Sequence, residues 1–375
     1  MFADMRRGPL ASGTLASPTQ PEQLDQSDQR LYVFGSPGHW YLSDGREGFD
    51  TPTHGPFSNV EVIRGDILVC TRDSHRQIVF FRDGSYLYET NVDEIVVDVS
   101  ADKRFIALKG EAGFRVVEPA VDKVCIEGYS NIHKLSGGYV IGGDRRPDFL
   151  LYTINGTAVL QDQLAQVSGV SDGLVAANAK RIDEDWNWKE SAGYIDLNGT
   201  WVIGPSFFSV RPFRDGVAAA SVAVIDDGLA HAVDVGLVNP MGKWGLIGMD
   251  GQWLIHPSFD SLGDFHYGVA VAGMFTEDRR WQYTYINKNG EHINDDLYYE
   301  ASSFERGVAV ATTSSARVLI DVNGDALVVE DVGDIIDYDD NRAICRRSLG
   351  GNQFQFIVYE IPNGFVIESF TKTVD

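Results

Sequence analysis

The chain has 375 residues, and its 43% hydrophobic and 11% aromatic content is enough for a large packed core. Its 54 acidic residues against 31 Lys and Arg give a formal charge of −23, which argues against nucleic-acid binding and would attract a basic partner. The three cysteines, Cys70, Cys125 and Cys345, show no metal-binding spacing and indicate reduced thiols in a cytoplasmic protein.

The first 29 residues are polar and contain no apolar run after Arg6 and Arg7. They predict a disordered tail and no signal peptide. No later stretch approaches the roughly 18 apolar residues of a membrane span. From residue 30 to residue 375 we expect a single repeat domain.

Asn-Gly and Asp-Gly dipeptides recur along this domain between apolar runs, and such dipeptides predict β-hairpins with type I′ turns. Successive glycines are 34 to 52 residues apart, except for one gap of 72 that fits two periods of 36 and implies a degenerate ninth unit near 118–126. The eight dipeptides are Asp44-Gly45, Asp83-Gly84, Asn155-Gly156, Asn198-Gly199, Asp250-Gly251, Asn289-Gly290, Asn323-Gly324 and Asn363-Gly364.

Each unit carries two further signals. Large rings at Trp201 and Trp253 follow the turn, where they can cover the apolar face of the hairpin. Strands of small residues at 174–179, 217–221, 269–273 and 308–312 each follow a glycine, which suggests strands that converge near the axis of a propeller. Helical periodicity is nearly absent, so we predict an all-β fold.

The three clearest copies lie at 193–220, 244–272 and 283–311, within residues 190–312. The second copy resembles the WG repeat of bacterial proteins. The first has Ala192 where the repeat has Trp, and the third lacks the Trp-Gly pair. The resemblance rests on Lys243, Trp244, Gly245, Ile247, Asp250, Gly251, Ile255, Pro257, Phe259, Asp260, Phe265 and Gly268. We assign structural positions in the repeat to Gly199, Trp201, Trp244, Gly245, Gly251, Trp253, Gly290 and Gly324.

The WG resemblance implies no particular activity, although some proteins with this repeat resemble the immunity members of bacterial toxin–immunity pairs. For the architecture we predict a β-propeller of seven to nine small antiparallel blades. Nine units exceed the usual four to eight, so the last hairpin, at 356–370, could share a blade with the N-terminal segment. The alternative is an open antiparallel β-solenoid.

Catalytic and metal-binding patterns are weak. Asp321, Asn323 and Asp325 alternate as in a calcium loop, but Gly324 stands at the wrong position for one, so we interpret the segment as a hairpin. His256 and His266 share one repeat and look structural, and no P-loop, HExxH or GxSxG motif occurs. We expect no metal, cofactor or catalytic residue; a propeller enzyme with carboxylates in its channel is an alternative.

Three junctions between a small-residue strand and the next hairpin are longer than the corresponding one at 312–317. They span 179–192, 223–242 and 275–282, at the same position of the repeat, so we expect them on one face as a recognition surface. Aromatic and charged residues together are typical of binding hot spots; alternatively, the tryptophans cap the array. The candidate partner-binding residues are Asp183, Glu184, Asp185, Trp186, Trp188, Asp226, Asp227, Glu277, Asp278 and Trp281.

Together these features predict a non-enzymatic protein-binding module with a basic partner, for example an immunity protein that neutralises a basic toxin. A carbohydrate- or cell-wall-binding propeller is the alternative.

Overall fold

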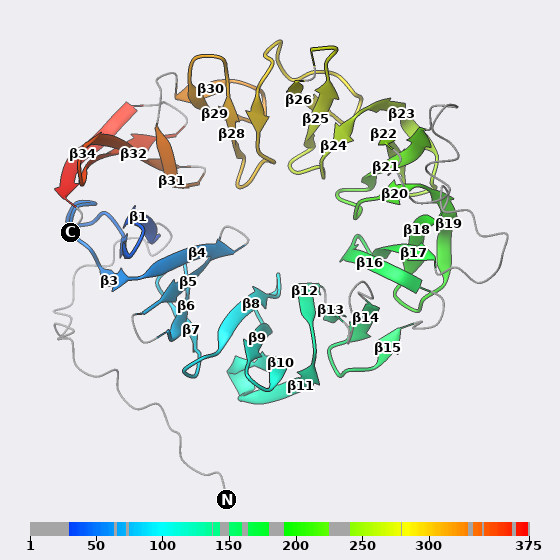
Figure 1. Cartoon of the computed structure of the whole chain (residues 1–375), viewed down its shortest axis with the longest axis horizontal. Coiled ribbons are helices and arrows are strands. Elements are labelled where there is room, and N and C mark those ends of the chain that lie inside the picture. The colour runs from blue at the N-terminus through cyan, green and yellow to red at the C-terminus, as the bar shows by residue number, and fades with distance from the viewer. Residues whose placement is uncertain are drawn as a thin grey trace, which may run out of the picture.

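In the computed structural model, the described part of the chain forms nine small antiparallel sheets around a common axis (Figure 1). The structure describes residues 30–63, 66–72, 75–136, 138–142, 150–159, 164–179, 191–224, 241–278, 280–328, 333–339, 341–361 and 365–373. In chain order the sheets form blades 1 to 9 of a β-propeller. In the described part of the chain, the one helical segment is a single 3₁₀ turn at Pro119–Val121.

The first four blades come from the N-terminal half of the chain. Their strands are, for blade 1, β1 (Tyr32–Ser36), β2 (His39–Ser43) and β3 (His54–Phe57); for blade 2, β4 (Asn59–Ile63), β5 (Ile67–Thr71), β6 (Gln77–Phe81) and β7 (Tyr86–Glu89); for blade 3, β8 (Ile95–Val99), β9 (Ile106–Gly110), β10 (Gly113–Glu118) and β11 (Lys123–Tyr129); and for blade 4, β12 (Ile132–Ser136), β13 (Tyr139–Gly142), β14 (Leu150–Thr153) and β15 (Ala158–Val159).

The other five blades complete the ring. Their strands are, for blade 5, β16 (Leu164–Ser171), β17 (Leu174–Ala179), β18 (Ala192–Asp196) and β19 (Trp201–Phe207); for blade 6, β20 (Ser209–Val210), β21 (Val217–Val224), β22 (Met241–Gly248) and β23 (Trp253–Phe259); for blade 7, β24 (Ser261–Leu262), β25 (Val269–Phe275) and β26 (Trp281–Asn287); for blade 8, β27 (Glu300–Ala301), β28 (Val308–Thr312), β29 (Arg317–Asp321) and β30 (Ala326–Val328); and for blade 9, β31 (Asp334–Tyr338), β32 (Arg342–Gly350), β33 (Gln353–Glu360) and β34 (Phe365–Thr373).

The hydrophobic core is divided among the contacts between blades. The described residues contain nine buried clusters, and each joins one blade to the next, including blade 9 to blade 1 through Phe34, Ile344 and Phe356. Nine blades in an open array would have only eight such contacts. The ring is therefore closed, and the propeller prediction is confirmed over the open solenoid.

Closure takes a different form from the shared blade that we considered. The last hairpin belongs to blade 9, whose four strands pair among themselves in the order β31-β32-β33-β34. Blade 1 is a separate sheet of β1, β2 and β3. The two ends of the domain meet by packing side chains face to face.

The small-residue strands are the second strands β17, β21, β25 and β28. In β21, Ala218 and Ala220 pack against blade 5, whereas Ala219 packs against blade 7. Because side chains alternate between the two faces of a strand, one small strand contacts both neighbours, and larger side chains there would push the blades apart.

The prediction of type I′ geometry at the Asn-Gly and Asp-Gly turns is wrong. In the described turns of this kind only the glycine has a positive φ, as at Gly199 (+89°) and Gly251 (+75°). The Gly199 amide donates to the Asp196 carbonyl at 3.0 Å, and the pairing shifts register just beyond the turn. This geometry is a type I turn followed by a glycine bulge. The Asp196 carboxylate favours it by accepting hydrogen bonds from the amides of Asn198 and Thr200.

Two successive residues with positive φ occur at a different turn of the repeat, the one that connects the first strand of a blade to its second. Asp215 (+50°) precedes Gly216 (+81°), and Tyr267 (+55°) precedes Gly268 (+80°). These pairs match type I′ geometry, and they directly precede the small-residue strands. The tight I′ hairpins of the repeat are therefore at this position.

Candidate binding face

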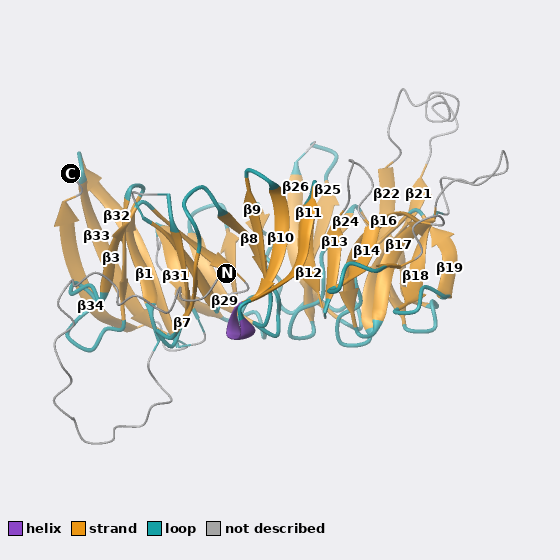
Figure 2. Cartoon of the chain, turned by 90° about the horizontal axis from the view of Figure 1, so that it is seen from below, coloured by secondary structure: helices purple, strands orange, loops and turns teal. Residues whose placement is uncertain are grey.

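The three long junctions leave the ring at equivalent places. Each connects the second strand of a blade to the third, and the flanking strands pair up to the edge: Asn178 with Ala192, Val224 with Met241, and Phe275 with Trp281. We call this side of the disc the upper face, because it is uppermost in Figure 2. The strand ends that bracket the junctions therefore lie on one face.

Most of the predicted partner-binding residues lie outside the described residues. These are Asp183, Glu184, Asp185, Trp186, Trp188, Asp226 and Asp227. The remaining three, Glu277, Asp278 and Trp281, belong to the hairpin between β25 and β26. All three are exposed.

Blade 7 presents a row of aromatic rings at this hairpin. Trp281 is 40% exposed and Phe275 is 42% exposed. The two residues are direct cross-strand partners, with ring centroids 5.4 Å apart. Two residues along β26, the Tyr283 ring stacks on Trp281 at 5.9 Å with an angle of 11° between the planes. The sequence analysis identified Trp281 but missed Phe275 and Tyr283. The sequence did contain a signal for them, because Phe275 and Trp281 stand at the two ends of the same junction and Tyr283 follows two residues later.

The hairpin is held by polar contacts at its base. The Asp260 carboxylate, from the end of blade 6, accepts a hydrogen bond from the Phe275 amide at 2.9 Å and one from Lys243 Nζ at 2.6 Å. Burial works against its charge, but these hydrogen bonds hold the pKa of Asp260 below its ordinary value. At the tip, the Thr276 amide donates to the Arg280 carbonyl at 2.9 Å. The aromatic row therefore stands on a fixed support that links blades 6 and 7.

The residues that define the WG repeat have structural positions. A Cβ on Gly245 would lie 2.4 Å from the Ile255 carbonyl oxygen, at the bulge where β22 meets β23. The half-buried Trp244 ring lies 5.2 Å from the Arg211 guanidinium of the same blade. Trp253 packs edge-to-face on Phe207 of blade 5 at 5.5 Å. Trp201 is partly buried against the cluster between blades 4 and 5.

The described residues contain no group of three or more side chains that could hold a metal ion. In the segment that resembles a calcium loop, Asp321 Oδ1 accepts hydrogen bonds from the amides of Asn323 and Asp325, which closes the turn of a hairpin. Of the described helices, none is long and apolar enough to span a membrane.

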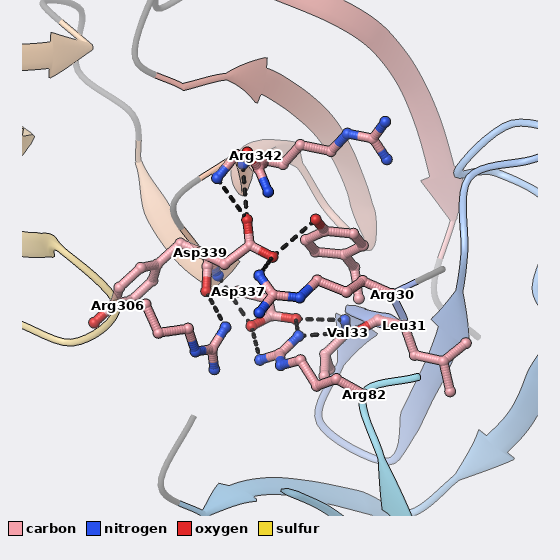
Figure 3. A network of polar contacts seen from close by, with 11 residues as sticks. Arg30, Leu31, Val33, Arg82, Arg306, Asp337, Asp339 and Arg342 are labelled. Carbon is pink, nitrogen blue, oxygen red and sulfur yellow. Dashed lines mark hydrogen bonds and ion pairs between the residues drawn. The ribbon is translucent and has the colours of Figure 1, made fainter. Parts of the chain in front are cut away.

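A buried polar network, separate from the upper face, joins the two ends of the domain (Figure 3). Arg82 of blade 2 makes two 2.6 Å hydrogen bonds to Asp337 of blade 9, and both side chains are under 5% exposed. Asp337 also accepts from the Val33 amide at 2.8 Å. Burial opposes the charge of Arg82, but Asp337 more than offsets it and raises the pKa of Arg82.

Asp339 extends this network toward the start of the described chain. Its carboxylate accepts hydrogen bonds from Tyr32 Oη at 2.9 Å, Arg30 Nη1 at 2.8 Å and the Arg342 amide at 2.9 Å. Burial works against the Asp339 charge, and these donors together hold its pKa below the usual range. The network therefore satisfies two buried carboxylates inside the closing junction by hydrogen bonds.

Comparison with known proteins agrees with this architecture. The family model described as "WG containing repeat" matches residues 193–222 and 244–273. The chain carries two WG containing repeats. The third copy predicted from the sequence, at 283–311, lies outside these matches. A search of curated proteins finds no significant relative.

Among solved structures, the chain is similar to a eukaryotic initiation factor, with 7% identity, a TM-score of 0.57, and coverage of 92% of this chain and 96% of that one. BamB from Moraxella catarrhalis is 12% identical with a TM-score of 0.42, over 82% of this chain and 92% of that one. At such low identity the likeness to the initiation factor shows the fold alone, which is that of a β-propeller.

Proposed function

We propose that the chain is a non-enzymatic binding module that engages a basic protein partner through the upper face of blades 6 and 7. The observation that carries the proposal is the exposed pair Phe275 and Trp281, backed by the half-buried Tyr283 ring and fixed beside the strand ends of the longest junctions. Exposed aromatic rings on a rigid support are typical anchors of protein interfaces because they bury large area at a low cost in conformational entropy.

The charge of −23 supports a basic partner. A strongly acidic surface speeds the encounter with a cation-rich protein, and salt screens that attraction. The finer proposal is an immunity role, in which the upper face masks a basic toxin inside the cytoplasm. It rests on this charge and on the family resemblance of the repeat.

The test uses the basic polypeptide captured by the full chain, with affinity and rates measured by biolayer interferometry. We expect Trp281→Ala to weaken binding by about 2 kcal/mol or more while leaving the melting temperature nearly unchanged. Tyr86→Ala, which removes a 55% exposed ring from blade 2, is the matched control and should bind normally. Equal binding by wild type and Trp281→Ala would refute the proposed face.

Charge is tested separately on the same complex. Between about 50 and 500 mM salt the association rate should fall steeply while dissociation changes less. An association rate that stays constant over that range would mean that the acidic surface serves solubility and not recognition.

A carbohydrate ligand is the second candidate, and the nearly parallel rings of Trp281 and Tyr283 favour it. Flat apolar ring faces bind the apolar faces of sugars, and the neighbouring carboxylates of Glu277 and Asp278 could accept hydrogen bonds from hydroxyl groups. Tryptophan fluorescence during titration with soluble chitin or peptidoglycan oligosaccharides distinguishes the two functions. A saturable change that is lost in Trp281→Ala would favour the sugar.

A further inference from the structure

A pocket of about 530 Å³ opens where the turns between first and second strands approach the axis of the ring. Its lining comes from blades 2 and 3 on one side and from blades 6, 7 and 8 on the other, which face each other across the ring in Figure 1. The pocket is therefore the mouth of the central channel. It lies on the lower face, opposite the proposed partner site, because these turns are at the other ends of the strands.

The charge of this pocket differs from that of the whole chain. Among the described residues, its lining has three cations, Lys103, Arg214 and Arg306, and two acidic residues, Asp66 and Glu305. Lys103 lies 3.8 Å from Asp66, so the charges of these two side chains partly cancel. The described lining residues thus carry a net charge of +1 in a protein whose formal charge is −23.

Two of these cations have no carboxylate partner in the part of the chain that the structure describes. Among the described residues, neither Arg214 nor Arg306 has a carboxylate oxygen within 4.0 Å, and the buried Nε atom of each makes no hydrogen bond. Within the described part of the chain, the Arg306 side chain makes one hydrogen bond, from Nη1 to the Tyr338 carbonyl at 2.6 Å. Figure 3 shows its side chain reaching toward the pair of Arg82 and Asp337.

Neighbouring arginines are paired differently. Arg211 and Arg346 also have a buried Nε without a hydrogen bond, but Arg211 lies 3.7 Å from Asp264 and Arg346 lies 2.8 Å from Asp334. A partly buried guanidinium without a counter-charge costs free energy, so its presence calls for a compensating ligand. Burial and the nearby Arg82 charge lower the pKa of Arg306, as expected for a cation that lacks such a partner.

The repeat frame singles out the same turns. Arg214, His266 and Glu305 occupy one equivalent position, because each pairs its backbone with the valine three residues later. The next residue takes a positive φ in each blade, and blades 7 and 8 place Tyr267 (+55°) and Arg306 (+51°) there. A large side chain in this conformation is strained relative to Asn, Asp or Gly. Two blades thus carry unfavourable residues where their side chains line the pocket.

We propose that this axial pocket binds the phosphate group of a small, soluble phosphate monoester, with Arg214 and Arg306 as its main contacts. A phosphate monoester brings two negative charges and three terminal oxygens to two guanidinium groups from different blades, whereas a carboxylate brings a single charge. The pocket volume suits a ligand with an organic part beyond the phosphate.

Two other lining residues fit this ligand. Burial and the neighbouring Arg214 lower the pKa of His266, so the ring is neutral near pH 7 and can donate one hydrogen bond to a phosphate oxygen. Tyr267 is 58% exposed at the rim and offers a ring face to the organic part.

The test is isothermal titration of the full chain with glycerol 3-phosphate and inorganic phosphate, with glycerol as the uncharged probe. We expect both phosphates to bind and glycerol not to bind. Arg214→Gln and Arg306→Gln should each lower the affinity for glycerol 3-phosphate at least about tenfold. Arg317→Gln is the matched control, because Arg317 lies at the other end of blade 8 and is paired with Glu300 at 3.9 Å; this variant should bind like wild type.

Melting curves without ligand separate this site from a structural role. Since Arg214 lacks a counter-charge among the described residues, Arg214→Gln should leave the melting temperature unchanged or raise it, whereas Arg306→Gln also loses the hydrogen bond to the Tyr338 carbonyl and should lower it slightly. Addition of phosphate should stabilise only the wild type and the Arg317→Gln control. The proposal would be overturned if no phosphate bound up to about 10 mM, or if all three arginine variants lost affinity for glycerol 3-phosphate equally. Binding of a protein partner to the upper face is measured independently and is expected to be unaffected.

Discussion

The junction between blades 6 and 7 and the junction between blades 9 and 1 hold neighbouring blades together by different chemistry. Between blades 6 and 7 the contact is made of small and aromatic side chains from the repeat, such as Ala219, Phe265 and Ala270. Between blades 9 and 1 an aromatic cluster around Phe34 and Phe356 adjoins the buried ionic network of Asp337 and Asp339.

This difference follows from the positions of the two junctions in the chain. Blades 6 and 7 are consecutive repeats, so the same contact recurs whenever the same residues recur. The closing junction joins segments about 300 residues apart, as Tyr32 and Asp339 show. Buried charges are costly unless they meet one particular partner, so a network of this kind favours closure at nine blades over a slipped or open ring.

The largest effect is expected from breaking the closing network. Asp337→Ala leaves Arg82 buried without its counter-charge, and we expect a loss of about 3–5 kcal/mol of unfolding free energy, measured by urea denaturation. Glu300→Ala, which breaks the exposed ion pair with Arg317, should change stability by about 1 kcal/mol or less. Similar losses in the two variants would mean that closure does not depend on the network.

Acid should weaken the closing junction selectively. Asp339→Asn removes a carboxylate that accepts several hydrogen bonds, which should cost about 1.5–3 kcal/mol at pH 7. Because the pKa of Asp339 is lowered in the folded state, its stabilising contribution is present above about pH 4 and is lost as the pH falls through the folded pKa. The stability gap between wild type and Asp339→Asn should therefore narrow below about pH 4. A gap that is constant with pH would contradict the assignment.

The repeat side of the comparison is tested at a turn. Gly251 has φ +75°, and a Cβ there would lie 2.9 Å from Ile203 Cγ2 of blade 5. We expect Gly251→Val to cost about 1–3 kcal/mol, read from the melting temperature. Gly204→Ala is the matched control, because Gly204 has no positive φ and no atom near the added Cβ; it should change stability by about 0.5 kcal/mol or less.

The smallest effect concerns a single hydrogen bond between repeats. Tyr285 Oη of blade 7 donates to the Ser302 carbonyl of blade 8 at 2.8 Å, as Tyr194 does to Arg211 between blades 5 and 6. Tyr285→Phe keeps the ring and removes the hydroxyl, so we expect a loss of about 1 kcal/mol in unfolding free energy. A loss as large as that of Asp337→Ala would erase the distinction between apolar and polar junctions.

Part of the candidate binding face could be predicted from the sequence. The three long junctions occupy the same position in the repeat, and this predicted that they lie on one face. The charged residues next to Trp281 in the sequence identified it as a candidate binding residue. The residues of the axial pocket were not predicted, and His266 had looked structural. Arg214, His266 and Arg306 are tens of residues apart and meet only because the ring closes around them.

The sequence by itself determined the unit of this protein: a hairpin repeat with a small-residue strand and a Gly turn in each blade. These features depend on local backbone geometry and on alternation along a strand, so short segments contain the information. Only the tertiary structure decided the turn class at the Asn-Gly sites, the closure at nine blades and the meeting of Arg214 and Arg306 at the axis. Those properties depend on hydrogen bonds and charges between residues far apart in the chain, and no periodicity in the sequence encodes them.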